Sequence, residues 1–209
     1  TDDERLEEML ANLQRGNHKS AQENPAQVGR LLTKDVTHGF AMVVPTNMVP
    51  LIPDAMVQPT GLAEQWVLDD KGERTVKYRV TQDLTYAEST KDQPISVNSR
   101  IDMNANPEMI YGWCLPRIIT FIVALRLFWP GISIFIAKYD YSDAYRRIAH
   151  SAKAVAQTIT TLGDLAFVYW RLTFGGSPNP PPWCCFSEMV TDLANEISMC
   201  DKWDPDTLR

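Results

Sequence analysis

The chain has 209 residues, of which 44% are hydrophobic, and it carries a formal net charge of −6. This length suffices for one sizeable core, or for two small lobes that share one. The acidic total excludes a uniformly basic nucleic-acid binder. Residues 100–175, however, hold more Lys and Arg than Asp and Glu, and this segment can still bind phosphates because salt screens the distant acidic groups.

Cysteines and histidines are few, and their spacing does not suggest a zinc site. They are Cys114, Cys184, Cys185, Cys200, His18, His38 and His150. We expect the thiols to be reduced, and we see no signal peptide at the start. Both observations predict an intracellular protein of the cytoplasm or nucleus. The most apolar stretch, residues 118–137, is interrupted by Arg126 and by Pro130-Gly131. We therefore predict a buried helix followed by a buried strand, and no membrane partner.

Residues 1–63 predict an N-terminal helix followed by an extended segment. The helix covers residues 1–16, with Thr1 or Asp2 as the N-cap and Gly16 as the stop signal. Proline recurs through residues 17–60. This part is therefore predicted to be rich in loops, with one short strand near residues 39–44.

Residues 64–111 predict a β-hairpin and a polar loop. Two β-prone runs flank the turn sequence Asp69-Asp70-Lys71-Gly72. On the second strand, Lys77 and Arg79 share one face because side chains alternate along a strand. This face is either a solvated surface or a cationic arm over an anionic ligand. Residues 87–111 are polar and rich in turn residues, which indicates a loop.

Residues 112–209 predict helices alternating with strands. A helix over 115–129 is followed by a buried strand over 132–140, a short helix, and a second hairpin that turns at Gly163-Asp164. A proline-rich loop over 173–182 then leads into a long amphipathic helix. The mixture predicts an α+β fold in which helices pack on one face of an antiparallel sheet.

Two short stretches carry residues suited to chemistry. Asp140 ends the predicted buried strand, and Asp143 follows in "YDYSDAYRR". Such carboxylates are either helix caps or ligands of a hard cation such as Mg²⁺, which Asp140 and the backbone carbonyl of Tyr141 can coordinate. In "RLTFGGSPNPPPW", Gly175 allows a close backbone approach, either within a structural turn or toward a ligand.

Taken together, these stretches resemble the reverse transcriptases of retroelements over roughly residues 64–200. "KYDYSDAYRRI" is similar to the palm motif, in which a strand ends in the catalytic Asp and an aromatic residue follows five positions later. "RLTFGGSPNPPPW" resembles the next motif of the family. "DDKGERTVKYRVTQDLTY" resembles the fingers hairpin, with Arg79 and Asp83 at the basic and acidic positions, and "QPISVNSRI" fits the linker toward the palm.

The resemblance implies a role for each matching residue in templated nucleotidyl transfer with two Mg²⁺ ions. Asp140 is implied as the catalytic residue and metal ligand, and the carbonyl of Tyr141 as a second ligand. Tyr145 would reject a 2′-hydroxyl. The remaining nucleotide-binding positions are Lys71 and Arg79 for the triphosphate, Phe174 and Gly175 beside the template base, and Tyr141, Ser142, Asp143 and Ala144 around the catalytic Asp.

One motif of the family is missing from these 209 residues. The aromatic-x-Asp-Asp hairpin, which supplies the second metal-binding carboxylate, should follow the long helix. The resemblance therefore implies the fingers and the first half of a palm, with the rest of the palm and the thumb as the missing partner segment. The implied ligands are an RNA or DNA template-primer and a dNTP. The alternative is a non-catalytic remnant that binds nucleic acid or protein through the same surface.

Overall fold

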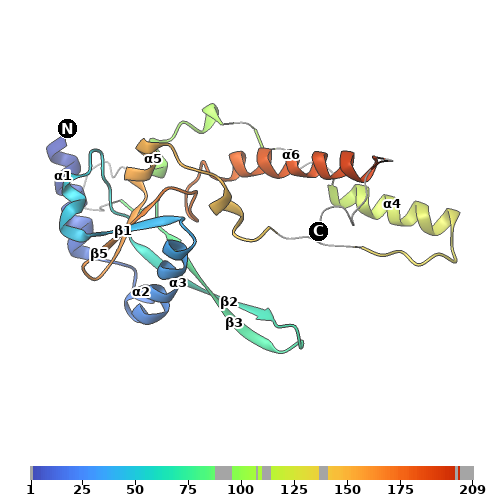
Figure 1. Ribbon diagram of the computed structural model, residues 1–209, viewed down its shortest axis with the longest axis horizontal. Coiled ribbons are helices and arrows are strands. Elements are labelled where there is room, and N and C mark those ends of the chain that lie inside the picture. Colours follow the sequence, from blue (N-terminus) through green and yellow to red (C-terminus); the bar gives the residue numbers. More distant parts are fainter. Residues whose placement is uncertain are drawn as a thin grey trace.

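A three-stranded antiparallel sheet organises the computed structural model, which describes residues 2–87, 96–106, 108–109, 114–136, 141–200 and 202. The strand order is β1 (Ala41–Pro45), β5 (Leu165–Tyr169), β4 (Ile159–Leu162). Strands β2 (Thr60–Leu68) and β3 (Arg74–Gln82) form a separate hairpin that extends away from this sheet (Figure 1). The predicted α+β class with antiparallel sheets is confirmed.

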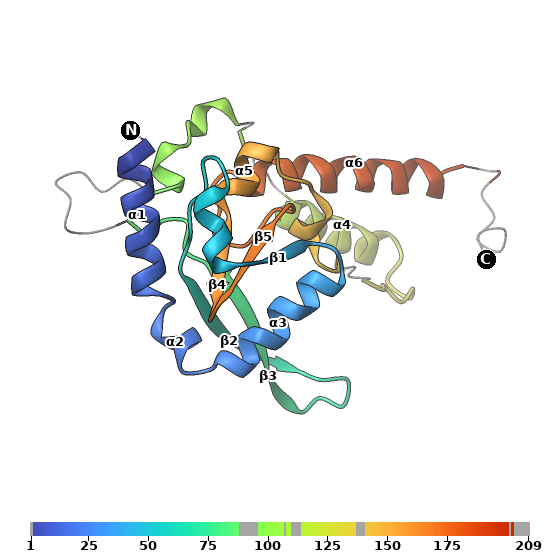
Figure 2. The ribbon, with the colours of Figure 1, turned by 60° about the vertical axis from the view of Figure 1, so that its left-hand side comes forward.

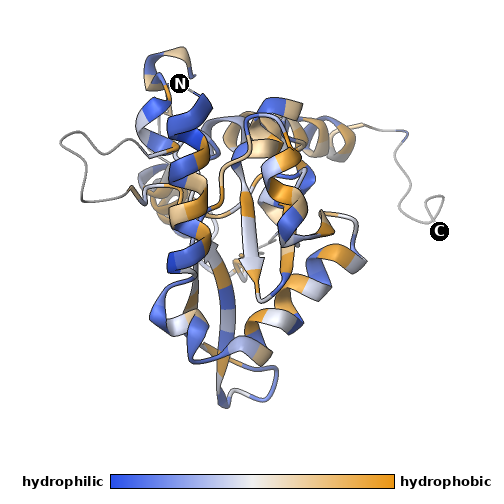
Figure 3. Ribbon diagram, turned by 90° about the vertical axis from the view of Figure 1, so that its left-hand side faces the viewer, coloured by the Kyte–Doolittle hydropathy of each residue, from blue (hydrophilic) through white to orange (hydrophobic). Residues whose placement is uncertain are grey.

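Helices and short 3-10 turns connect these strands. The helices are α1 (Asp2–Arg15), α2 (Lys19–Gln22), α3 (Pro25–Thr37), α4 (Cys114–Phe128), α5 (Ala152–Gln157) and α6 (Pro180–Ser198). The 3-10 helices are η1 (Thr46–Leu51), η2 (Asn98–Arg100), η3 (Met103–Ala105) and η4 (Ala144–Arg147). In Figure 3, α1 presents mostly hydrophilic residues to the viewer, and Met9 of this helix lies buried against the core.

Both faces of the sheet are covered, whereas the sequence led us to expect helices on one face. Ala166 and Val168 of β5 pack with Met9 of α1 on one side. Phe167 and Tyr169 point to the other side, where they pack with residues of α3 and of the hairpin. Figure 2 shows α1 and α3 on opposite sides of the sheet. The cause is that every inner residue of β5 is apolar, so the strand buries both of its faces.

The N-terminal segment differs from the prediction for residues 17–60. The strand near residue 41 is present, but helices α2 and α3 occupy much of the part that was predicted to be extended. Pro25 stands at the start of α3, where a missing N–H costs nothing. Val28 and Leu32, one helical turn apart, form the buried face of this helix.

The apolar stretch after residue 113 also differs from the prediction. The helix over 115–129 exists as α4, but it is exposed rather than buried, with Phe121 65% and Leu127 76% accessible. The buried strand predicted over 132–140 is wrong for residues 132–136, which are not in a strand; Phe135 is 91% accessible. Residues 137–140 lie outside the described part. The sheet is formed by β1, β5 and β4, and residues 132–136 are not part of it.

Within the described residues, no helix is both long enough and apolar enough to cross a membrane.

Candidate functional site

Aromatic rings from three separate segments meet beside the base of the hairpin. The rings of Tyr145 and Phe174 lie 5.2 Å apart in an edge-to-face arrangement. Trp183 contacts Tyr145 at 6.4 Å and Tyr141 at 5.1 Å, and it also contacts Phe186 at 5.6 Å. These spacings are typical of favourable ring contacts. We call Tyr141, Tyr145, Phe174, Trp183 and Phe186 the aromatic cluster.

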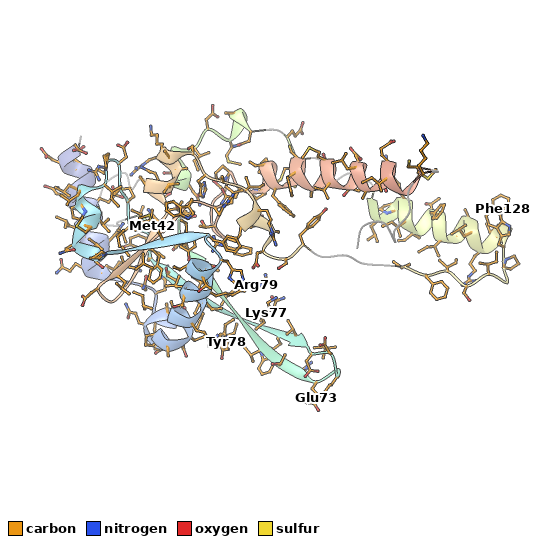
Figure 4. All side chains as sticks on the ribbon, viewed as in Figure 1. Met42, Glu73, Lys77, Tyr78, Arg79 and Phe128 are labelled. Atoms are coloured by element: carbon orange, nitrogen blue, oxygen red, sulfur yellow. The ribbon has the colours of Figure 1, made fainter. Side chains whose placement is uncertain are left out.

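Arg79 brings a positive charge to this cluster from β3. Its guanidinium carbon lies 6.0 Å from the centre of the Phe174 ring, at the outer limit of a cation–π contact. Lys77 and Arg79 leave β3 on one side and Tyr78 on the other, as Figure 4 shows. The aromatic cluster therefore has an exposed cationic strand face at one end, as the alternation of side chains predicted.

The loop that carries Phe174 is joined directly to the end of β3. The N–H of Gln82 donates a hydrogen bond of 3.2 Å to the carbonyl oxygen of Phe174. Gly175 has φ +110°, and a Cβ at this position would overlap the carbonyl oxygen of Gln82. Only glycine tolerates this approach. The close backbone approach predicted at Gly175 is thus made to the hairpin backbone.

A buried ion pair anchors the turn that carries Tyr145. Arg146 donates to Asp35 Oδ2 of α3 at 2.9 Å and to the carbonyl oxygen of Leu172 at 2.9 Å. The Tyr169 hydroxyl donates to the same Asp35 oxygen at 3.0 Å, and the guanidinium of Arg146 stacks over the Tyr169 ring. Burial, and then the Asp35 carboxylate, raise the pKa of Tyr169, so this hydroxyl remains a donor at neutral pH.

Asp143 faces the same helix. Its Oδ1 lies 3.6 Å from Nζ of Lys34, and the Ser142 hydroxyl donates to its Oδ2 at 3.2 Å. Its backbone is left-handed, with φ +53°. Sequence reasoning did not identify Lys34 or Asp35, because it did not predict α3. The spacing of Val28, Leu32 and Val36 was the signal that could have revealed this helix.

Not all of the predicted site residues come together. Ala144 lies in η4 next to Tyr145, but Lys71 lies in the hairpin turn, where its N–H binds Asp69 Oδ1. That turn lies beyond Arg74, and Arg74 is about 17 Å from Arg79 along β3. Lys71 is therefore far from the aromatic cluster. Asp140 lies outside the described residues, so the structure does not place the predicted catalytic carboxylate.

Among the described residues, no group of three or more His, Cys, Asp or Glu side chains lies close enough to hold a metal ion. Asp143, which among the described residues is the carboxylate nearest to Tyr141 in the sequence, faces Lys34 instead. The magnesium prediction therefore continues to depend on Asp140 and on the Tyr141 carbonyl.

A large cavity lies outside the aromatic cluster. It has a volume of about 1190 Å³ and is lined by residues of α1, the 97–101 segment, α5 and the 176–182 segment. Nε2 of His150 is buried in this region and has no hydrogen-bond partner among the described residues. Burial, with the charge of Arg146, lowers the pKa of His150 to about 4. No residue of the aromatic cluster lines this cavity.

Comparison with protein-family models, curated proteins and solved structures found no match to this chain.

Proposed function

We propose that the chain forms the fingers and the first half of the palm of a retroelement RNA-directed DNA polymerase, and that it binds a dNTP and a template-primer at the aromatic cluster. One observation supports this best. Arg79, Tyr145 and Phe174 come from three separate sequence stretches, each of which resembles a different motif of that family, and they meet in space. Coincidental motif matches would have no reason to converge.

Each residue has a defined task in this proposal. Arg79 binds the triphosphate, since a guanidinium forms charge-assisted hydrogen bonds with phosphate oxygens. Phe174 and Tyr145 present an apolar wall to the base and the sugar of the nucleotide. The wall is rigid because Phe174 is tied to Gln82 and the Tyr145 turn is tied to α3. Asp140 and the Tyr141 carbonyl would hold Mg²⁺, which supplies charge stabilisation during phosphoryl transfer when bound.

Titration of the purified chain with a fluorescent dATP analogue in the presence of Mg²⁺ tests the proposal. Arg79→Ala should weaken binding about tenfold, the loss of one or more charge-assisted hydrogen bonds. Arg74→Ala is the matched control, because Arg74 is exposed on the same strand but on its other face. Tyr145→Ala should bring the affinities for ATP and dATP closer together. Equal losses for Arg79→Ala and Arg74→Ala, or no binding by the unaltered chain, would refute the proposal.

A further inference from the structure

The Asn98 side chain lies where the linker, the end of the hairpin and the Phe174 loop meet. Its Nδ2 donates to the carbonyl oxygen of Gly175 at 2.8 Å and to the hydroxyl of Thr85 at 2.9 Å. Its Oδ1 accepts from the N–H of Ser177 at 2.9 Å and from the Ser177 hydroxyl at 3.2 Å. Both amide hydrogens and both oxygen lone pairs are thus used within the chain.

These contacts join elements that are far apart in the sequence. The N–H of Asn98 also donates to the carbonyl oxygen of Leu84, just beyond β3. Asn98 therefore holds the 84–85 segment on one side and the 175–177 segment on the other. The bond between Gln82 and Phe174 makes a second connection, just before each of these two segments. Phe174 lies directly next to Gly175, whose carbonyl Asn98 holds.

We propose that Asn98 is a positioning residue that fixes the Phe174 loop against the hairpin and thereby sets the affinity of the aromatic cluster for a nucleoside triphosphate. This inference rests on the proposed function. Asn98 acts through the loop, since its amide has no hydrogen-bonding capacity left for a ligand. Nothing in the local pattern singles out Asn98, because it lies in a polar linker and its partners are as far as 79 residues away.

The chemistry of the amide makes the inference specific. An aspartate at this position has the same shape and can still accept the two bonds from Ser177. It cannot donate, however, and it would place a carboxylate oxygen against the Gly175 carbonyl oxygen, where Nδ2 now lies at 2.8 Å. If Asn98 only filled space, Asn98→Asp would resemble the unaltered chain. If it positions the loop by donating hydrogen bonds, Asn98→Asp should be at least as harmful as Asn98→Ala.

Two measurements on the full chain test this. Hydrogen exchange of the peptide over residues 173–179 reports the loop, and titration with the fluorescent dATP analogue reports the nucleotide site. In Asn98→Ala and in Asn98→Asp we expect exchange in 173–179 to accelerate about tenfold, the size of one lost hydrogen bond, and affinity to fall by a similar factor. Exchange over β5 should not change. Asn104→Asp, an exposed residue further along the same linker, is the control and should leave both readouts unchanged.

The outcomes separate this inference from the proposed function. Unchanged exchange over 173–179 in both variants, or an Asn98→Asp variant that behaves as the unaltered chain, overturns the role of Asn98. If the unaltered chain does not bind the analogue, the proposed function and the nucleotide half of this inference fail, and the exchange data still decide whether Asn98 fixes the loop. Should the Asn98 variants fail to fold, Thr85→Val removes one acceptor only and should produce a smaller change in the same direction.

Discussion

The ion pair between Asp35 and Arg146 offers a sharp test of how the Tyr145 turn is held. Asp35→Ala removes the carboxylate that accepts from Arg146 at 2.9 Å and from the Tyr169 hydroxyl at 3.0 Å. The Arg146 side chain is 9% exposed and that of Asp35 is 17% exposed, so water can replace the lost partner only in part. Its guanidinium would keep the hydrogen bond to the Leu172 carbonyl and the stacking contact with the Tyr169 ring.

The expected cost follows from this geometry. Leaving one member of a buried ion pair uncompensated costs about 3–5 kcal/mol. We do not add a separate penalty for the Tyr169 hydroxyl, because Arg146 and Tyr169 donate to the same oxygen of Asp35. For a chain of this size, that corresponds to a fall in melting temperature of roughly 6–20 °C. Arg146→Met combined with Asp35→Leu should be far less destabilising than Asp35→Ala, because both charges are removed together.

Urea denaturation followed by tryptophan fluorescence measures these differences. Asp192→Ala on α6 is the control, since its exposed carboxylate should contribute within about 0.5 kcal/mol. A cost below about 1 kcal/mol for Asp35→Ala, or additive effects of the Asp35 and Arg146 substitutions in a double-mutant cycle, would contradict the reasoning. Either result would mean that α3 does not hold the Tyr145 turn through this pair.

Three further outcomes are expected. Gly175→Ala should destabilise the chain by about 1–3 kcal/mol in the same urea assay, because φ +110° is unfavourable for alanine and the new Cβ meets the Gln82 carbonyl. Gly39→Ala separates these two causes, because Gly39 also has a positive φ but no atom lies within 4 Å of the position of its Cβ. His150 should make folding less stable as pH falls from about 6.5 to about 4, because the unfolded state takes up the proton at the higher pH; stability curves of His150→Gln should lack this loss, and identical curves would contradict it. The 209-residue chain should not extend a primer on a homopolymer template with Mg²⁺ or Mn²⁺, since Asp140 lacks the second carboxylate of the resemblance; robust extension would disprove this.

Local turn chemistry made the hairpins predictable. Asp69 Oδ1 accepts from the N–H groups of Lys71 and Glu73, and Gly72 has positive φ, so the Asp69–Gly72 turn is determined by adjacent residues. The same holds for the end of α1 at Gly16, which also has positive φ. Such features need no information from distant parts of the chain, and each was predicted correctly.

Burial could not be predicted in the same way. Helix α4 is apolar on nearly all sides, so its sequence does not define a single face for packing. Helix α3 was missed for the opposite reason, because the prolines around it indicated loops although Pro25 occupies the one helical position that tolerates it. For α4 the neighbours in space decide the burial, and the local pattern does not encode them. For α3 the spacing of Val28, Leu32 and Val36 did indicate a helix, but the prolines outweighed that signal in our prediction.

Residues of the candidate site were likewise predictable where a local motif marks them, and not where distant contacts place them. Arg79, Tyr145 and Phe174 were predicted because each belongs to a motif with recognisable local spacing, and the structure brings them together. Asp35 was not predicted, because it meets Arg146 across 111 residues of sequence. Asn98 was not predicted for the same reason. Sequence motifs thus identified side chains that line the cluster, and only the structure revealed the residues that hold them.

The position of Tyr145 shows why such support is needed. Asp143, two residues before it, has a left-handed backbone, a conformation that is unfavourable for a residue with a Cβ and persists only where surrounding contacts enforce it. Lys34 lies 3.6 Å from the Asp143 carboxylate in a half-exposed ion pair, and Asp35 binds Arg146 more firmly on the other side of Tyr145. Two consecutive residues of α3 therefore contact the turn, one before and one after Tyr145. Helix α3 contributes no aromatic ring to the cluster, but its contacts help to position the Tyr145 ring against Phe174. Substitutions in α3 should therefore alter the cluster without removing any of its rings.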